Sequence, residues 1–365
     1  MLWLTALILP YFTVFAVTCL LLVRKDRDKN RDTGGDIRLS LIIPVRNEAS
    51  SLPQLLADLS GQSLDKHKYE IIIVDDASED ASPEIIKNYR NNIPDLKIIN
   101  GPGQGKKKAL EAGLKEAEGN YIITTDADCR VQSTWLEEMC YAIEKNEPDM
   151  LIGAVNIINT GGLFNRFVQL EFLALQGVTE AFARIGRPVM CNGANLCFRK
   201  PDINNYPEIV KDKLPSGDDI FLMEKYKKES KKIRWTDREG TFVETKGADS
   251  LRDFFRQRAR WSSKSIYYTD PLLIAIALLV FLSSSVIVAT IISAIFYSYL
   301  WPAVALMYIL KTIPDICILS YMCRKRKRQY LLGIIVPAQL LYPFYIVSAG
   351  TAGLIRGLSS LPKGK

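Results

Sequence analysis

Four long apolar segments constrain the fold of this 365-residue chain more than any other feature. One covers residues 1–23, and three lie near the other end, at 272–295, 300–322 and 331–355. Each is close to the roughly 20 residues with which a helix crosses the hydrocarbon core of a bilayer. The stretch between the first two segments is long and polar enough for a folded domain. The sequence therefore predicts a multi-pass membrane protein with an anchor, a large polar domain and three further spans.

Basic residues predict how these segments are oriented. Arginines and lysines crowd residues 24–31, directly after the first segment, and residues 324–328 are all basic. Because basic loops stay on the cytoplasmic side, both clusters predict that the polar domain lies in the cytoplasm. The membrane is then the inner or plasma membrane of the cell. A secretory signal would carry its charge before the apolar run, so we expect an uncleaved anchor. The two clusters also explain much of the +7 net charge and predict anionic lipid, with no nucleic acid, as their partner.

The composition excludes several kinds of site. His67 is the only histidine, which excludes histidine-rich metal sites and disfavours a Ser-His-Asp triad. The seven cysteines lack zinc-site spacing and are expected to be free thiols in a cytoplasmic domain. Any general base must therefore be a carboxylate or a lysine.

Three buried-strand patterns organise the polar domain, at 39–45, 70–74 and 121–125. Each ends in a polar turn, and helix-like stretches follow the first two turns, at 49–59 and 82–91. This alternation predicts an α/β fold with a mainly parallel, doubly wound sheet. Ligands of such sheets bind beyond the carboxyl ends of the strands.

Acidic residues follow all three strands at that edge. They are Glu48, the pair Asp75-Asp76, and Asp126 and Asp128. Closely spaced carboxylates can hold Mg²⁺ or Mn²⁺, and such a cation neutralises phosphate. The alternative for Asp126 and Asp128 is a cap or solvated turn, and that for Asp75-Asp76 is an N-cap of the next helix. Convergence of the three turns on one edge favours a ligand site.

Two further stretches carry candidate residues. The glycines of 101–105 lead into three lysines without phosphate-loop spacing, and Lys106 is the predicted anion contact, with a solvated turn as the alternative. Asp218 and Asp219 open a stretch with helical periodicity. Asp218 is expected to be the N-cap, and Asp219, in the first turn, can serve as a general base.

Two amphipathic stretches complete the pattern. Residues 249–268 are rich in arginine and suit the membrane interface, where we expect Arg252, Arg256 and Arg258 to snorkel. Residues 161–185 predict a helix that rests either on the bilayer or on the core.

In their order these motifs resemble those of family 2 inverting glycosyltransferases of the GT-A fold. The likeness is greatest to the membrane-embedded branch with cellulose, chitin, hyaluronan and poly-N-acetylglucosamine synthases. The set is I-I-P-x-x-N-E, D-D-A-S, G-x-G-K, D-A-D, G-D-D and Q-x-x-R-W, found here at 42–48, 75–78, 103–106, 126–128, 217–219 and 257–261.

The resemblance implies roles for individual residues. Asp219 is the catalytic base, and Asp128, with Asp126, ligates Mg²⁺ or Mn²⁺. Arg260 lies near the pyrophosphate, and Trp261 lies under the acceptor sugar. The implied substrate contacts are Glu48, Asp75, Asp76, Lys106, Asp126, Asn195, Asp218, Gln257, Arg260 and Trp261. For Asn195, in the loop 191–195, a structural turn is the equal alternative.

The resemblance also divides the chain. The expected parts are an anchor at 1–23, a basic linker at 24–37, a GT-A catalytic domain at 38–248, an interface helix with Q-x-x-R-W at 249–270, three spans at 271–356 and a tail at 357–365.

The implied function is metal-dependent transfer of a sugar from a nucleotide-sugar, expected to be a UDP-sugar, to a saccharide or lipid-linked acceptor at the cytoplasmic membrane face. Extension of a polysaccharide and transfer of one sugar to a lipid carrier are the two forms. Because four spans are sparse for an export channel, a partner subunit or homo-oligomer is a further hypothesis. A non-catalytic scaffold that senses nucleotide-sugars is the alternative from another class. A transporter is disfavoured, since Asp315 is the main charge within the spans and could lie near a helix end.

Overall fold

The computed structural model describes residues 5–24, 36–93, 95–201, 205–211, 214 and 217–359. Two compact units divide the chain. The helical unit comprises residues 1–25, 159–182 and 247–365, and the sheet unit comprises 26–158 and 183–246. Residues 159–182, which the sequence placed within the polar domain, thus belong to the helical unit. Most of the basic linker, at 25–35, and most of the tail, at 360–365, lie outside the described residues.

A seven-stranded sheet forms the core of the sheet unit, in the order β3-β2-β1-β4-β8-β6-β9. All its neighbours are parallel except β8, which runs antiparallel to β4 and to β6. Its strands are β1 (Leu39–Val45), β2 (Tyr69–Asp75), β3 (Leu96–Asn100), β4 (Tyr121–Thr124), β6 (Met150–Gly153), β8 (Leu196–Arg199) and β9 (Ile233–Thr236). The mainly parallel sheet and the three predicted strands are confirmed. A second sheet joins β5 (Arg130–Val131), β10 (Val243–Thr245) and β7 (Val155–Ile157).

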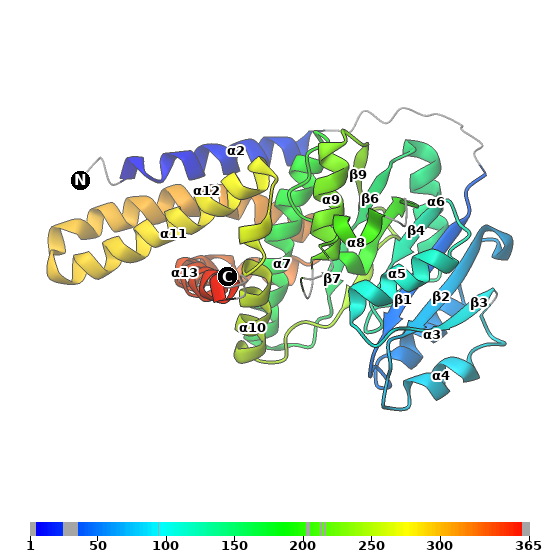
Figure 1. Cartoon of the computed structure of the whole chain (residues 1–365). Coiled ribbons are helices and arrows are strands. Elements are labelled where there is room, and N and C mark those ends of the chain that lie inside the picture. The colour runs from blue at the N-terminus through cyan, green and yellow to red at the C-terminus, as the bar shows by residue number, and fades with distance from the viewer. Residues whose placement is uncertain are drawn as a thin grey trace. The chain divides into compact units, whose positions relative to one another are not determined.

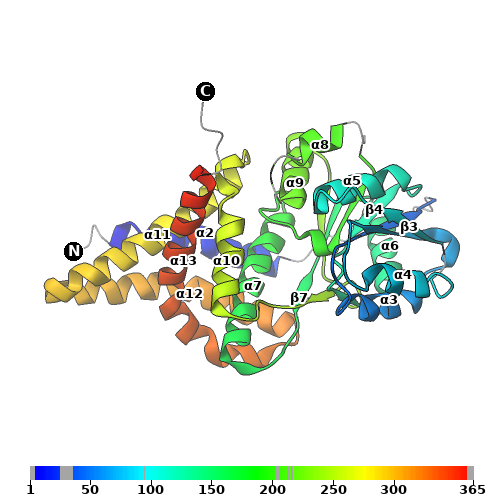
Figure 2. The ribbon, with the colours of Figure 1, turned by 60° about the horizontal axis from the view of Figure 1, so that its bottom comes forward.

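Helices cover both faces of the larger sheet (Figure 2). The connections through α3 (Leu52–Ser60) and α4 (Ser82–Asn88) advance from β1 to β3, whereas α5 (Lys106–Glu116) leads back to β4. Since such crossovers are right-handed, α5 lies on the face opposite α3 and α4. A Cβ on Gly113 would lie 2.5 Å from Ile42 of β1, so glycine is what lets α5 approach the sheet. The unit also contains α6 (Trp135–Asn146), α8 (Tyr206–Ile209) and α9 (Asp218–Lys228).

The parallel register brings the strand ends to one edge. Val45 lies opposite Asp75, and Asp75 lies opposite Asn100. On the other side of β1, Ile42 lies opposite Thr124, the last residue of β4. The predicted convergence of the three turns is therefore confirmed.

Pro44 occupies a part of β1 that tolerates proline. The carbonyl of Val45 accepts from the N–H of Asp76, so Val45 faces β2 and the preceding Pro44 faces the side of β4. Because β4 pairs with β1 only as far as Ile42, the missing N–H of Pro44 removes no hydrogen bond between strands.

The helical unit consists of long helices (Figure 1). They are α2 (Leu9–Val23), α7 (Gly162–Ala183), α10 (Leu251–Ser262), α11 (Pro271–Phe296), α12 (Trp301–Lys325) and α13 (Ile335–Ser359). The predicted helix at 161–185 is α7, and its Leu170 and Leu173 pack against Leu319 and Leu331. Of the two alternatives for this helix, the bilayer or the core, Leu170 and Leu173 therefore pack in the core.

Among the described residues, three helical segments are long and apolar enough to cross a membrane: Pro271–Phe296, Ser298–Lys325 and Gln329–Ser359. These match the three C-terminal spans that the sequence predicts. The helix α2 has 15 residues, or about 22 Å, which is less than the hydrocarbon core. The first of the four predicted spans therefore stays a prediction.

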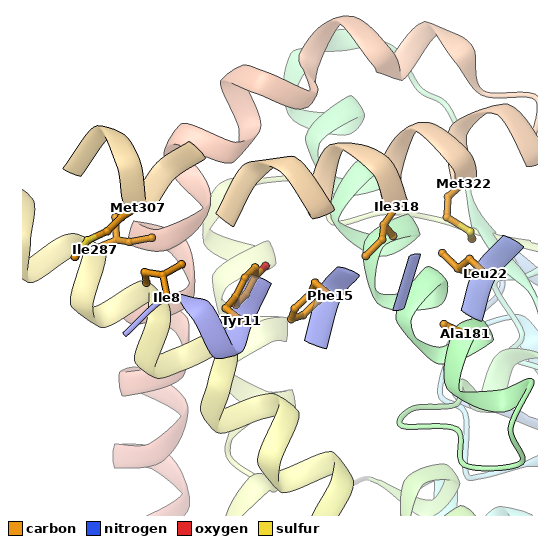
Figure 3. Packing of buried hydrophobic residues seen from close by; sticks show 9 residues of the cluster. All are labelled: Ile8, Tyr11, Phe15, Leu22, Ala181, Ile287, Met307, Ile318 and Met322. Atoms are coloured by element: carbon orange, nitrogen blue, oxygen red, sulfur yellow. The ribbon is translucent and has the colours of Figure 1, made fainter. Parts of the chain in front are cut away.

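Apolar contacts hold α2 against the longer helices (Figure 3). Ile8, Tyr11, Phe15 and Leu22 of this N-terminal segment share a buried cluster with side chains of α7, α11 and α12. The rings of Tyr11 and Phe15 stack with centroids 4.3 Å apart.

A polar cluster lies within this apolar packing. Lys311 is completely buried, and its Nζ donates to Asp315 Oδ2 at 2.7 Å and to Gln339 Oε1 at 2.5 Å. The Tyr11 hydroxyl donates to Asp315 Oδ1 at 2.9 Å. The suggestion that Asp315 lies near a helix end is wrong, because Asp315 is in the middle of α12. Its charge is balanced by Lys311, one turn earlier.

Candidate active site

Side chains connect the loops that follow β1 and β2. Asn47 Oδ1 accepts from the N–H of Glu79, and the N–H of Asn47 donates to Ser78 Oγ at 3.0 Å. The N–H of Glu48 donates to Ser82 Oγ at 2.9 Å, which fixes the backbone of this candidate residue. Asp75 Oδ1 accepts from the N–H of Ser78. The helix α4 begins after Ala81, so an N-cap role for Asp75-Asp76 is wrong.

Asp76 organises the glycine loop that follows β3. Its carboxylate accepts from the N–H of Gly103 at 2.7 Å, of Gln104 at 3.2 Å and of Gly105 at 2.7 Å. Asp76 is 2% exposed. Gly103 and Gly105 have φ of 70° and 96°, in the region that favours glycine. The buried carboxylate therefore holds the turn that leads into α5 and Lys106.

Lys106 lies among three of the candidate carboxylates. Its Nζ donates to Asp126 Oδ1 at 2.5 Å, and each side chain of the pair is about a third exposed. Desolvation alone would lower the pKa of Lys106, but Asp126, Asp218 and Asp219 outweigh it and raise that pKa. The ammonium group thus stays charged at the edge of the sheet, where an anion would meet it.

Asp128 and Glu48 form a second group with Asp126. Burial, and then the charge of Asp126, raises the pKa of Asp128. Burial, and then the charge of Asp128, raises the pKa of Glu48. Thr245 Oγ1 donates to Asp128 Oδ2 at 3.4 Å. The three carboxylates therefore repel one another, and a nearby cation would relieve that repulsion.

The donor set fits a hard divalent cation. No group of three or more His, Cys, Asp or Glu side chains suited to a metal occurs in the part of the chain that the structure describes. Proteins commonly hold Mg²⁺ with one or two carboxylates, and substrate phosphates complete the coordination. Asp126 and Asp128 supply that number of carboxylates and would hold such an ion, which would relieve their mutual repulsion.

Asp219 is held by backbone N–H groups. Its Oδ2 accepts from the N–H of Gly193 at 3.1 Å, and its Oδ1 accepts from the N–H of Ile220 at 2.8 Å. Gly193 is itself fixed, because its carbonyl accepts from Thr124 Oγ1 at 2.7 Å. The expected N-cap position of Asp218 is off by one residue: Gly217, with φ of 94°, is the N-cap of α9. Asp219 lies in the first turn, as predicted.

The loop containing Gly193 places the carboxylates and the lysine side by side. A Cβ on Gly193 would lie 3.5 Å from Lys106 Nζ and 3.8 Å from both Asp218 Oδ2 and Asp219 Cβ. Since those groups come from α5 and α9, the missing side chain of Gly193 leaves the space in which they meet.

Asn195 has a structural role in the same loop. It is completely buried, and its Nδ2 donates to the carbonyls of Ala154 and Thr241, both at 2.8 Å. Its Oδ1 accepts from Trp135 Nε1 at 3.3 Å. The carboxamide is thus occupied within the core, and a structural turn replaces the expected contact with an acceptor.

The Q-x-x-R-W residues lie on α10 of the helical unit. Arg260 is exposed, whereas Gln257 and Trp261 are half-buried. Arg258 does not snorkel, as the sequence suggested, but forms a buried ion pair with Glu171 of α7 at 2.5 Å. Its guanidinium stacks 4.1 Å from the ring of Trp261. Arg256 does remain exposed, where it pairs with Asp253.

The sheet unit thus carries carboxylates and a lysine at the carboxyl edge of a mainly parallel sheet, which is where α/β domains bind their ligands. Residues 40–205 match the model of the family described as Glycosyl transferase family 2. Residues 40–205 therefore form a glycosyltransferase family 2 domain of the GT-A fold, as the motifs indicated.

Curated relatives support this assignment over part of the chain. The chain is 31% identical over 125 residues to glycosyltransferase AglE of Haloferax volcanii. This match covers 34% of this chain and 41% of that protein. It is 36% identical over 114 residues to the cholesterol galactosyltransferase of Borreliella burgdorferi, covering 31% of each. It is 38% identical over 94 residues to an undecaprenyl-phosphate 4-deoxy-4-formamido-L-arabinose transferase of Pseudomonas syringae, covering 25% and 28%. The chain thus spans less than half the length of these relatives.

One solved structure resembles the whole fold. The mannosyltransferase PcManGT from Pyrobaculum calidifontis, in complex with GDP-Man and Mn²⁺, is 18% identical, with a TM-score of 0.58. The likeness covers 98% of this chain and 100% of that one. It shows a shared fold, including the helices that flank the GT-A domain.

Sequence reasoning missed two residues at these sites. Gly193 was noted only as part of a loop, and its role depends on side chains that come from other elements. Glu171 is the only charged residue between Arg166 and Glu180 of α7, and that isolated charge was the signal that could have indicated a buried partner.

Proposed function

We propose that this protein is a membrane-bound, metal-dependent inverting glycosyltransferase. It moves a hexose-type sugar from a nucleotide donor to a saccharide or lipid-linked acceptor at the cytoplasmic face of the cell membrane. The observation that carries the proposal is the grouping of Lys106 with Asp126, Asp218 and Asp219 at the carboxyl edge of the sheet.

The residues beside the glycine loop receive the donor. Glu48 and Asp75 lie near the ends of β1 and β2 and face the nucleoside in this proposal. Asp76 holds the glycine loop that leads to Lys106. A bound Mg²⁺ or Mn²⁺, held by Asp126 and Asp128, would neutralise the charge that develops on the leaving diphosphate. Lys106 adds a fixed positive charge for the same purpose. Arg260 and Trp261 keep the pyrophosphate and acceptor roles that the family resemblance gives them.

Asp219 acts as the general base. Two backbone N–H groups orient its carboxylate, and the side chain remains partly exposed, so an acceptor hydroxyl can reach it. As Asp219 takes the hydroxyl proton, the hydroxyl oxygen bonds to the anomeric carbon and the bond to the diphosphate breaks. Attack from the side opposite the leaving group inverts the configuration.

The test uses the full chain, purified in lipid vesicles, with Mn²⁺ and a panel of UDP-N-acetylglucosamine, UDP-glucose, UDP-galactose and GDP-mannose. Undecaprenyl phosphate and short oligosaccharides serve as acceptors, and sugar transfer is measured. Asp219→Asn should lower the rate at least about 100-fold, since it removes the base. Asp65→Asn, which changes a single exposed turn bond, is the matched control. Equal transfer by Asp219→Asn and the parent protein would contradict the role of Asp219.

The same assay tests the metal and the form of the product. A chelator should abolish transfer, and added Mn²⁺ or Mg²⁺ should restore it, whereas undiminished transfer in the chelator would exclude metal dependence. A ladder of product lengths would indicate polymer extension. A single added sugar on undecaprenyl phosphate would indicate transfer to a lipid carrier. Metal-dependent nucleotide binding without transfer from any donor would instead favour the sensing scaffold.

A further inference from the structure

Arg258 of α10 contacts two residues of the Q-x-x-R-W motif at once. Its Nη1 donates to Gln257 Oε1 at 2.6 Å, and its guanidinium carbon lies 4.1 Å from the ring centroid of Trp261. The motif itself does not include this position. The arginine is nevertheless buried, with only 5% of its side chain exposed.

Glu171 of α7 fixes the plane of this guanidinium. Arg258 Nε donates to Glu171 Oε1 at 3.0 Å, and Nη2 donates to Oε2 at 2.5 Å. The two parallel bonds leave the planar group no freedom to rotate. The hydroxyl of Tyr345, from α13, also donates to Glu171 Oε1 at 3.0 Å. Three helices of the helical unit therefore meet at one buried carboxylate.

Because burying both charges is costly, stability alone does not account for this ion pair. Removing both charges from water costs several kcal/mol per ion, and apolar residues of similar volume often stabilise a fold as well. A lysine could neutralise Glu171, but it could not bond in two places while stacking on an indole. The geometry is thus specific to arginine at position 258.

We propose that Glu171 and Arg258 are positioning residues for the acceptor side of the transferase, acting through Gln257 and Trp261. The bidentate pair sets the guanidinium plane, and that plane supports one face of the Trp261 ring. The bond to Gln257 Oε1 directs the amide nitrogen of Gln257 away from Arg258. This inference rests on the proposed function, because it concerns the motif that the family uses to receive the acceptor.

The helix α7 offers a matched control. Glu180 is also buried on this helix, with 1% of its side chain exposed, and it pairs with Lys325 of α12 at 2.5 Å. Glu180 and Lys325 lie on α7 and α12, whereas the Q-x-x-R-W motif and Arg258 lie on α10. A glutamine at 171 or at 180 therefore removes the charge of a buried, ion-paired glutamate from the same helix, but only Glu171 pairs with Arg258.

The experiment measures kcat and KM for the donor that turns over best in the panel above, with the full chain in vesicles and saturating acceptor. Glu171→Gln should lower kcat about 10- to 100-fold, as expected when a reacting group is misplaced, while the donor KM is unchanged. Arg258→Lys should show the same loss although it keeps the charge. Tyr345→Phe, which removes one bond to Glu171, should show a smaller loss. Glu180→Gln should keep the parent kcat.

The outcomes separate the two proposals. If the parent protein transfers sugar and Glu171→Gln has the parent kcat, or if Glu180→Gln loses as much, positioning by this pair is refuted and the proposed function stands. If Glu171→Gln does not fold, Tyr345→Phe decides: a lower kcat at unchanged donor KM supports the proposal, and an unchanged kcat overturns it. Absence of transfer by the parent protein with every donor contradicts the proposed function itself.

Discussion

Removal of the Asp76 carboxylate should release the glycine loop while leaving the sheet intact. Asp76→Ala deletes one acceptor group that serves three N–H donors, those of Gly103, Gln104 and Gly105. The loop is partly open to water, so each bond contributes about 1 kcal/mol, near the usual net value, and the three together contribute about 3 kcal/mol. The ion pair of Asp76 with the exposed Arg46, at 3.7 Å, adds little to this sum.

The assay is hydrogen exchange of the peptide that covers residues 101–108. A loss of about 3 kcal/mol corresponds to exchange that is faster by about 100-fold in this segment, since each 1.4 kcal/mol is a factor of ten. Peptides from β1 and β2 should exchange as in the parent protein. The affinity for UDP should fall in parallel, because the loop must then be ordered on binding.

Asp76→Asn provides a finer measurement. Asparagine keeps one acceptor oxygen but places its NH₂ group against at least one of the loop N–H donors. The loss should therefore be about 1–2 kcal/mol, between the parent protein and Asp76→Ala. Asp65→Ala, at an exposed turn, is the control and should leave residues 101–108 unaffected. Unchanged exchange of this segment in Asp76→Ala would refute the view that the buried carboxylate holds the loop.

Two further predictions concern buried charges. Glu70 is completely buried and pairs with Lys97. Burial alone would raise the pKa of Glu70, but hydrogen bonds from Lys97 and Ser40 lower it below the unfolded value of about 4.3. The ion pair therefore stabilises the fold above about pH 4.3, and this stability is lost as the pH falls towards the lower pKa of the folded state. Glu70→Gln should accordingly lower the thermal midpoint at pH 7 but not at acid pH, and an equal loss at both would contradict the linkage. Lys311→Met leaves Asp315 buried without its cation and should cost about 3–5 kcal/mol in detergent unfolding titrations. The double variant Lys311→Met/Asp315→Leu should recover most of that loss, and no recovery would show that the pair itself is not the cause.

The sequence predicted the parts of the fold that depend on local pattern. The β-branched runs of β1, β2 and β4 are found within a residue of their predicted bounds, because a strand buried on both faces admits few polar residues. The antiparallel β8 was not predicted. Its partners β4 and β6 are set by pairing across distant segments, which no local pattern encodes.

The candidate site shows the same division. Its acidic residues could be identified because each follows a recognisable strand or opens a helix. The roles of Asp76 and Asn195 could not, because each depends on which backbone groups the fold brings to its side chain. Arg258 was assigned to the membrane interface from its amphipathic stretch, whereas burial against Glu171 depends on a residue 87 positions away.

Pro44 has a consequence for the residues on the neighbouring strand. An isoleucine there would present one more N–H toward β4, and the chain after Thr124 could continue as a strand beside β1. Alternation along that strand would then commit Asp126 and Asp128 to one face of the sheet. The missing N–H of Pro44 thus contributes to the end of β4 before the two aspartates, together with the end of the pairing between β4 and β8 at Thr124. A designer who grafts the Asp-x-Asp triplet onto another parallel sheet would need to place a proline at the matching position of the adjacent strand as well. In this chain that strand is β1, which β2 and β3 separate from β4 in the sequence.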